Sequence, residues 1–167
     1  TEPRRRHGHE PFDGLRHESV ARYPELAARS VIVSSFGKTY HVTGWKVGYV
    51  LAPHELMAEF RKVHQFNVFT VNTPVQLALA DYMVDTSRYL DLAGFYQAKR
   101  DAFRAGLAHT GFELLPCTGT YFQTARYAAI SDAPDTEFVH WLTREVGVAA
   151  IPLSAFFGDG RDEKVIR

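Results

Sequence analysis

Apolar positions along the chain fall into short continuous runs and into longer stretches with helical spacing. Residues 30–34 are rich in Val and Ile, and such a run predicts a strand that is buried on both faces, as in a parallel sheet. Residues 47–52 predict a second strand. Leu56, Phe60 and Val63 then recur at helical spacing, which predicts an amphipathic helix directly after this strand.

The later part of the chain continues this alternation of strand and helix patterns. Thr73 and Pro74 mark a helix start, because threonine caps helices and proline is tolerated in the first turn. A longer helical pattern covers residues 87–108. The remaining patterns predict a helix capped by Asp135 and strands at residues 112–115, 120–124, 148–151 and 165–167. The alternation indicates an α/β fold, and we expect two domains, residues 1–85 and 86–167.

Composition limits the classes of protein to which the chain can belong. Of its 167 residues, 46% are hydrophobic and 13% are aromatic, which is enough for a packed core and excludes a disordered chain. The 19 Lys and Arg residues balance 19 Asp and Glu residues, so no nucleic-acid partner is expected. No apolar run reaches the ~18 residues of a membrane span, and the polar N-terminus is not a secretory signal.

Residues with thiol or metal-binding chemistry form no site pattern. The eight histidines lack metal-ligand spacing, so no metal site is predicted. Cys117 is the single cysteine, which excludes an internal disulfide and fits a reducing compartment. We therefore expect a cytoplasmic protein.

The two ends of the chain suggest a piece of a larger protein. The first residue is Thr1, and residues 165–167 look like a strand cut midway, with no turn or polar tail after it. Residues 4–7 form a short basic run. We expect this run to be a solvated end, and a phosphate or nucleic-acid patch is the alternative.

The residues with the most informative chemistry lie between positions 34 and 46. Lys38 follows the first predicted strand beside a glycine, and burial at such a place disfavours the ammonium form. A neutral lysine amine can condense with an aldehyde. The hydroxyls of Ser35 and Thr43 and the cation of Lys46 can hold a phosphate. Aldehyde and phosphate together indicate pyridoxal phosphate, and the alternative is an ordinary loop with two exposed lysines.

Residues 33–49 resemble the cofactor-lysine segment of the fold-type I, class I/II aminotransferases; they read Val-Ser-Ser-Phe-Gly-Lys-Thr-Tyr-His-Val-Thr-Gly-Trp-Lys-Val-Gly-Tyr. Within that family they are most similar to the methionine and kynurenine (glutamine-phenylpyruvate) branch. The resemblance continues through residues 61–65, 72–76, 119–122 and 149–154. It implies a fold of type I, with residues 1–85 at the end of the large cofactor domain and residues 86–167 forming most of the small C-terminal α+β domain.

The resemblance implies roles for four polar residues. Lys38 corresponds to the lysine that holds pyridoxal phosphate and moves a proton at the substrate α-carbon. Ser35 and Lys46 correspond to the hydroxyl and the cation that bind the cofactor phosphate. Arg167 corresponds to the arginine that grips the substrate α-carboxylate, for which a planar guanidinium is well suited.

Two aromatic residues lie in a region that, in this family, reaches the substrate pocket across a dimer interface. We expect Phe69 to contribute to that pocket and Phe66 to pack in the core. Tyr40 and Trp45 are expected to be structural.

The resemblance also implies an activity and partners. Enzymes of this branch transfer the amino group of methionine, or of aromatic or other large apolar amino acids, to a 2-oxo acid, and they are homodimers. Cysteine-conjugate β-lyase activity on the same scaffold is an alternative. A non-catalytic remnant or dimerisation module is another, because residues 4–7 occupy the place of the family's Asp-x-x-Tyr motif without matching it. Since that aspartate is missing, we expect the 167-residue chain by itself to be inactive.

Overall fold

The computed structural model describes residues 11–167, and this part of the chain divides into two compact units. Unit 1 ends at Ala93 and unit 2 comprises Gly94–Arg167. The basic run at residues 4–7, and with it the place of the Asp-x-x-Tyr motif, lies outside the described residues. The expected boundary between residues 85 and 86 concerns the domains of a larger protein and stays a prediction.

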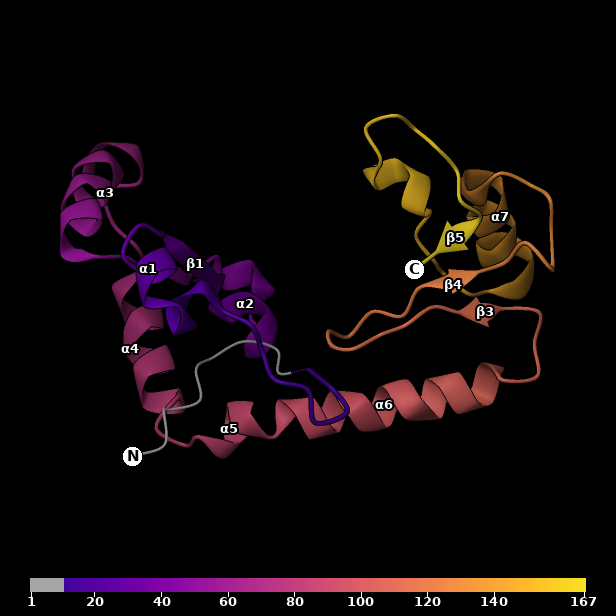
Figure 1. Cartoon of the computed structure of the whole chain (residues 1–167), viewed down its shortest axis with the longest axis horizontal. Helices are drawn as coiled ribbons and strands as arrows, with labels where there is room; N and C mark the ends of the chain where they lie inside the picture. Colours follow the sequence, from indigo (N-terminus) through magenta and orange to yellow (C-terminus); the bar gives the residue numbers. More distant parts are fainter. Residues whose placement is uncertain (1–10) are drawn as a thin grey trace. The chain divides into compact units, whose positions relative to one another are not determined.

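Unit 1 contains one strand pair and several helices (Figure 1). Its elements are η1 (Val20–Arg22), α1 (Pro24–Ala27), β1 (Ile32–Ser35), α2 (Phe36–Thr39), η2 (Thr43–Trp45), β2 (Gly48–Leu51), α3 (His54–Asn67), α4 (Thr73–Tyr82) and α5 (Ser87–Leu90). The two predicted strands and the helix after them are therefore confirmed. The helix expected over residues 87–108 is divided at Asp91 into α5 and the next helix, α6 (Leu92–Leu107).

The environment of β1 differs from the prediction of a strand buried in a parallel sheet. β1 pairs with β2 in antiparallel fashion, with Ile32 opposite Leu51 and Ser35 opposite Gly48. Within the described residues this sheet has two strands, so its faces are only partly covered. Val33 is accordingly 72% exposed. A buried apolar run indicates a strand, but it does not specify which other strands pair with it or cover it.

The core of unit 1 joins the segment after β1 to α4. Tyr40, Val47 and Leu79 are buried together, and they are surrounded by the partly buried Phe36, Val42, Val71, Val75, Met83 and Tyr89. The start of α4 confirms a helix at Thr73, but the capping residue was wrongly assigned. The Oδ1 atom of Asn72 accepts a hydrogen bond from the Val75 N–H at 3.2 Å, which makes Asn72 the N-cap.

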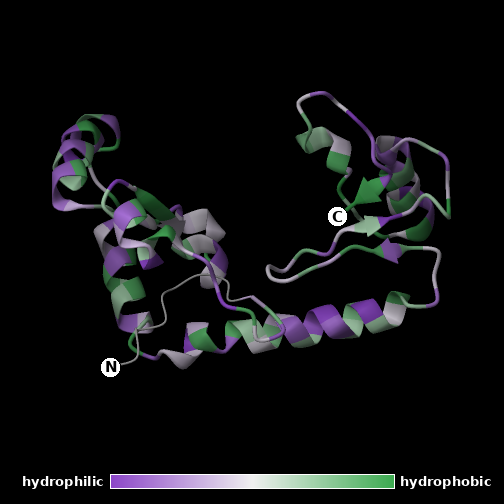
Figure 2. Cartoon of the chain, in the orientation of Figure 1, coloured by the Kyte–Doolittle hydropathy of each residue, from purple (hydrophilic) through white to green (hydrophobic). Residues whose placement is uncertain are grey.

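Unit 2 contains a three-stranded antiparallel sheet against which α7 packs (Figure 1). Its elements after α6 are β3 (Glu113–Leu114), β4 (Ala125–Arg126), α7 (Asp135–Trp141), a π-helical turn η3 (Leu142–Val146), η4 (Leu153–Phe156) and β5 (Val165–Ile166). The strand order is β3-β4-β5, so the last strand lies at one edge. Figure 2 shows β5 as strongly hydrophobic, and both of its residues are buried.

The core of unit 2 forms between this sheet and α7. Tyr127, Phe138, Val139, Leu142 and Ile166 are buried together. The rings of Tyr127 and Phe138 stack with centroids 4.0 Å apart. The helix predicted near residue 135 is therefore confirmed, although Asp135 is its first residue and Pro134 is its N-cap.

Two of the strands predicted in this unit are wrong. Residues 120–124 form a bend followed by irregular chain, Thr120 has a left-handed backbone with φ of 69°, and the strand begins at Ala125. Residues 148–151 form no strand, because the Val148 N–H completes the helical segment by donating to the Leu142 carbonyl. Ile151 still exchanges two backbone hydrogen bonds of 2.9 Å with Arg167. Apolar residues alone did not distinguish this irregular pairing from a strand.

Candidate active site

The segment around Lys38 is a tight turn between β1 and β2. Ser35 caps α2, and its Oγ atom accepts a hydrogen bond from the Gly37 N–H at 3.1 Å. The buried Gly37 carbonyl accepts hydrogen bonds from the Val42 N–H at 2.9 Å and from the Thr43 hydroxyl at 3.2 Å. A Cβ atom on Gly37 would lie 3.0 Å from the Thr43 Cα. The turn is therefore closed so tightly that position 37 favours glycine.

The two lysines of this turn are both exposed. Lys38 lies in α2 rather than in a buried place at the end of a strand, which corrects the expected environment. Lys46 follows η2 with a left-handed φ of 55°. Within residues 11–167, neither ammonium group makes a hydrogen bond or an ion pair with the protein. Both are available to a ligand.

Tyr40 anchors this turn to the core of unit 1. Its ring meets the rings of Tyr82 and Tyr89 edge to face, with centroids 5.8 Å and 6.4 Å away. Its hydroxyl is buried and has no hydrogen-bond partner. Burial, followed by the neighbouring tyrosines, raises the pKa of Tyr40 to about 12. Tyr40 is thus structural, as expected from the sequence, whereas Trp45 is exposed.

The groups present on this turn fit pyridoxal phosphate. The Ser35 hydroxyl accepts one hydrogen bond from the backbone and keeps its own proton for a phosphate oxygen. Lys46 offers an unpaired cation for the same anion, and Lys38 offers an unpaired amine for an aldehyde. Thr43 contributes less than expected, because its hydroxyl proton is used by the Gly37 carbonyl.

Arg167 belongs to unit 2, where its guanidinium lies near two aromatic rings. The guanidinium carbon is 3.9 Å from the centre of the Phe122 ring and 5.2 Å from that of Phe156. Its Nε atom is buried without a hydrogen-bond partner. A buried donor without a partner is costly, so this guanidinium is suited to an anionic ligand such as a carboxylate.

A cavity of about 360 Å³ lies beside Arg167 in unit 2. It is lined by Tyr96, Lys99, Arg100, Phe103, Cys117, Thr120, Tyr121, Phe122, Gln123 and Arg167.

Two arginines of α6 hold the loop that carries Phe122. Arg100 donates to the Cys117 carbonyl at 2.8 Å, and Arg104 donates to the Leu115 carbonyl and to the Gln123 Oε1 atom, both at 3.0 Å.

Sequence reasoning missed the residues that surround Arg167. Phe122 lies in one of the segments that resemble the family, but no role was assigned to it, and Phe156 was not considered. Arg100 and Arg104 are spaced four residues apart on one face of α6, which is the only local signal that they act together.

Two aromatic residues at and just beyond the C-terminal end of α3 are exposed. Phe66 is 88% exposed, so the prediction that it packs in the core is wrong for the described chain. Phe69 is 78% exposed and has a left-handed backbone with φ of 70°. Neither ring belongs to the hydrophobic core of unit 1, which leaves both available to another surface.

Metal-binding clusters and helices able to cross a membrane are both absent from residues 11–167. No group of three or more His, Cys, Asp or Glu side chains in that range is arranged to hold a metal ion. None of the helices described there has the length and apolarity that crossing a membrane requires.

These features agree with a comparison to protein families. The family model for aminotransferase class I and II matches residues 7–161. The chain therefore belongs to the class I and II aminotransferases, which are pyridoxal-phosphate-dependent enzymes of fold type I.

Individual relatives lie within the same family. A methionine aminotransferase of Escherichia coli K12 is 53% identical over 160 residues, which are 95% of this chain and 42% of that protein. A crystal structure of YbdL from Escherichia coli, described as having a methionine aminotransferase function, matches with a TM-score of 0.90 at 53% identity over 95% of this chain and 42% of that one. The structure of N-succinyldiaminopimelate aminotransferase from Mycobacterium tuberculosis matches with a TM-score of 0.81 at 36% identity and the same coverage.

A more distant relative is kynurenine–oxoglutarate transaminase 3 of Rattus norvegicus. It is 34% identical over 162 residues, which cover 87% of this chain and 36% of that protein. The chain thus spans between 36% and 42% of the length of these relatives.

Proposed function

We propose that this chain is part of a pyridoxal-phosphate-dependent aminotransferase that moves the amino group of methionine, or of an aromatic or other large apolar amino acid, to a 2-oxo acid. The observation that carries the proposal is the turn after β1, which presents Lys38, Ser35 and Lys46 with both ammonium groups unpaired. The substrate class rests on the similarity to a methionine aminotransferase and to kynurenine transaminases.

Lys38 is the proposed catalytic residue. When bound, the cofactor supplies an electron sink for the negative charge that develops at the substrate α-carbon. The unpaired Nζ atom of Lys38 would hold the cofactor aldehyde. When it is free, the same Nζ would accept the proton of the substrate α-carbon and return it, so one amine would serve as nucleophile and as general base and acid.

Ser35 and Lys46 are proposed to hold the cofactor phosphate. The Ser35 hydroxyl donates a hydrogen bond to a phosphate oxygen while its Oγ stays fixed by the Gly37 N–H. Lys46 neutralises part of the phosphate charge. Because the Ser35 Oγ is already fixed by the Gly37 N–H, less ordering of this group is needed when the ligand binds.

Arg167 and Phe69 are proposed to hold the substrate. The Arg167 guanidinium, which lines the cavity of unit 2, pairs with the α-carboxylate. The exposed ring of Phe69 supplies apolar surface for the substrate side chain from a second subunit. The enzyme would accordingly be a homodimer, and the lone thiol of Cys117 is consistent with a cytoplasmic location.

The proposal is tested in the complete cofactor-loaded enzyme that contains this chain. Methionine and a 2-oxo acid should yield the oxo acid of methionine and a new amino acid, whereas pyruvate and ammonia from a cysteine conjugate would indicate the β-lyase alternative. Lys38→Ala should abolish nearly all turnover, and borohydride reduction of the wild type should attach the cofactor to Lys38.

A matched control is Lys62→Ala, because Lys62 is an exposed lysine of unit 1 that pairs with Glu59 at 2.7 Å. This variant should keep wild-type turnover. Attachment of the cofactor to Lys46 or Lys62, or full activity of Lys38→Ala, would contradict the proposal.

A further inference from the structure

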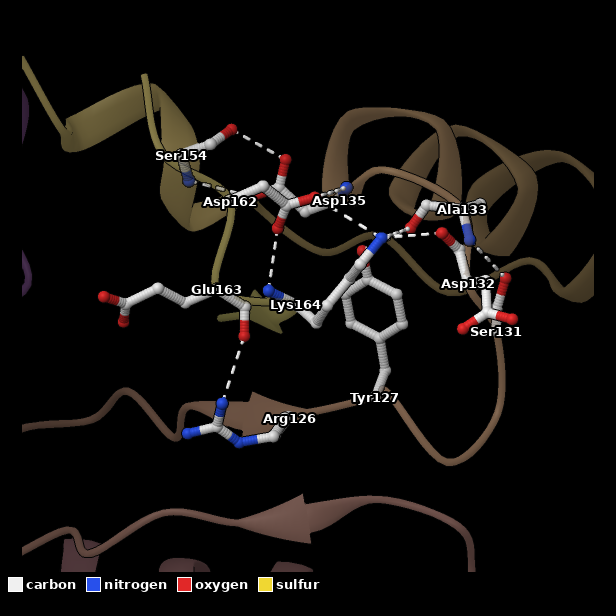
Figure 3. Close-up of polar contacts among 10 residues, drawn as sticks. All are labelled: Arg126, Tyr127, Ser131, Asp132, Ala133, Asp135, Ser154, Asp162, Glu163 and Lys164. Atoms are coloured by element: carbon white, nitrogen blue, oxygen red, sulfur yellow. Dashed lines mark hydrogen bonds and ion pairs between the residues drawn. The ribbon is translucent and has the colours of Figure 1, made fainter. Parts of the chain in front are cut away.

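The N-terminal end of α7 carries a cluster of polar residues that the proposed chemistry does not use (Figure 3). Asp135 is 2% exposed, and it is the one charged side chain that is buried among residues 11–167. Its Oδ2 atom accepts a hydrogen bond from the Ser154 N–H at 2.8 Å, and its Oδ1 atom accepts one from the Ser154 hydroxyl at 2.7 Å. A buried carboxylate is tolerated when it is hydrogen-bonded in this way. Asp135 therefore ties η4 to α7.

The same helix end also holds the loop that leads into β5. The Asp162 Oδ2 atom accepts a hydrogen bond from the Asp135 N–H at 2.9 Å. Lys164 has a left-handed φ of 56°, and its backbone N–H donates to the Asp162 Oδ1 atom at 2.7 Å. The Lys164 Nζ atom donates to the carbonyls of Asp132 and Ala133 at 2.6 Å and 2.9 Å (Figure 3). This loop is thus fixed at both its backbone and its side chains.

Both tethered segments end at the surroundings of Arg167. Ser154 lies in η4, which ends with Phe156, and the Phe156 ring is 5.2 Å from the Arg167 guanidinium. Lys164 directly precedes β5, and Arg167 directly follows it. The orientation of the guanidinium and of one of its two ring contacts therefore depends on segments that meet at the start of α7.

We propose that Asp135 is a positioning residue for Arg167, which it serves by holding η4 through the two hydrogen bonds that its carboxylate accepts from Ser154. This inference rests on the proposed function, in which Arg167 binds the substrate α-carboxylate. A guanidinium fixed in advance binds a carboxylate with less loss of side-chain freedom than a mobile one. A role of Asp135 in the stability of unit 2 alone would instead affect every ligand equally.

The test uses the complete cofactor-loaded enzyme with the substitution Asp135→Ala. Loss of both bonds to Ser154 should raise the KM for methionine about tenfold, while kcat at saturating methionine stays within about twofold. A direct binding measurement separates the two roles. The dissociation constant of 4-(methylthio)butanoate should rise by the same factor, whereas that of its primary amide, which lacks the carboxylate, should not change.

Further variants keep the test decisive if Asp135→Ala does not fold. Ser154→Ala removes one bond and leaves the backbone contact, so it should give a smaller rise for the carboxylate alone. Asp135→Asn can still accept from the Ser154 N–H and donate to its hydroxyl, so it should restore most of the affinity. Thr143→Ala is the control, because the Thr143 hydroxyl bonds to the Val139 carbonyl at the other end of α7.

Each result distinguishes positioning of Arg167 from a role in the stability of unit 2 alone. Equal weakening of carboxylate and amide binding, or unchanged carboxylate binding in Ser154→Ala and Asp135→Ala, would overturn the positioning role. A wild-type enzyme that binds the carboxylate but does not transaminate would refute the proposed function instead.

Discussion

Replacing Tyr40 with phenylalanine should stabilise unit 1 at neutral pH. The Tyr40 hydroxyl is buried and has no hydrogen-bond partner, and an unsatisfied buried polar group costs roughly 1–3 kcal/mol. Phenylalanine keeps the edge-to-face contacts with Tyr82 and Tyr89, since these involve the rings. We therefore expect Tyr40→Phe to raise the free energy of unfolding by about 1 kcal/mol.

The same residue should make stability depend on alkaline pH. The pKa of Tyr40 is raised from 10.0 to about 12, so between these values the unfolded chain loses a proton that the folded protein keeps. Ionisation of this group therefore leaves the free energy of unfolding unchanged below pH 10 and lowers it as the pH rises toward 12. A shift of this size corresponds to a loss of at most roughly 2–3 kcal/mol, which should be absent in Tyr40→Phe.

Urea unfolding of both proteins below pH 10 and near pH 12 measures these differences. Tyr127→Phe is the matched control, because the pKa of Tyr127 is also raised to about 12 but its hydroxyl donates to the Ala133 carbonyl at 2.8 Å. This control should lose about 1 kcal/mol at neutral pH. The reasoning is refuted if Tyr40→Phe is less stable than the wild type at neutral pH. It is also refuted if the free energy of unfolding of Tyr40→Phe falls by as much as that of the wild type between neutral and high pH.

Two further substitutions test the turn after β1. Lys46→Ala in the complete enzyme should weaken cofactor binding by roughly 1.5–3 kcal/mol in a titration while turnover at saturating cofactor changes little, because it removes one charge-assisted contact; unchanged affinity would argue against a phosphate role. Gly48→Ala should destabilise the β1–β2 pair by about 1–3 kcal/mol, because its Cβ would lie 2.5 Å from the Ser34 carbonyl oxygen. If Gly48→Ala has the same free energy of unfolding as the wild type, the strands can move apart without cost and the prediction is wrong.

The sequence predicted those elements whose signals are local. The spacing of Leu56, Phe60 and Val63 defined α3, and the proline near the start of α4 located that helix to within a residue. The motif around Lys38 identified the candidate cofactor site because its glycine, hydroxyl and cations lie within one short turn. Such features depend on neighbours within a few positions along the chain, so no knowledge of the fold is needed to find them.

Contacts between distant residues could not be predicted in this way. The antiparallel pairing of β1 with β2 and the exposure of Val33 depend on which strands surround them, and the irregular pairing of Ile151 with Arg167 joins positions far apart in the chain. The apolar run at residues 148–151 was wrongly predicted as a strand for that reason.

The sequence by itself thus indicated the family, the helices α3, α4 and α7, and Lys38, Ser35, Lys46 and Arg167 as candidate site residues. Only the tertiary structure decided the surroundings of Arg167, because its ring contacts come from the loop at Phe122 and from η4. It also decided the hydrogen-bond partner of Asp135, which the sequence indicated as a helix cap and which instead bonds to Ser154. The physical reason is that a buried polar group must find its partner wherever the fold brings one within reach, and that distance along the chain does not limit the choice.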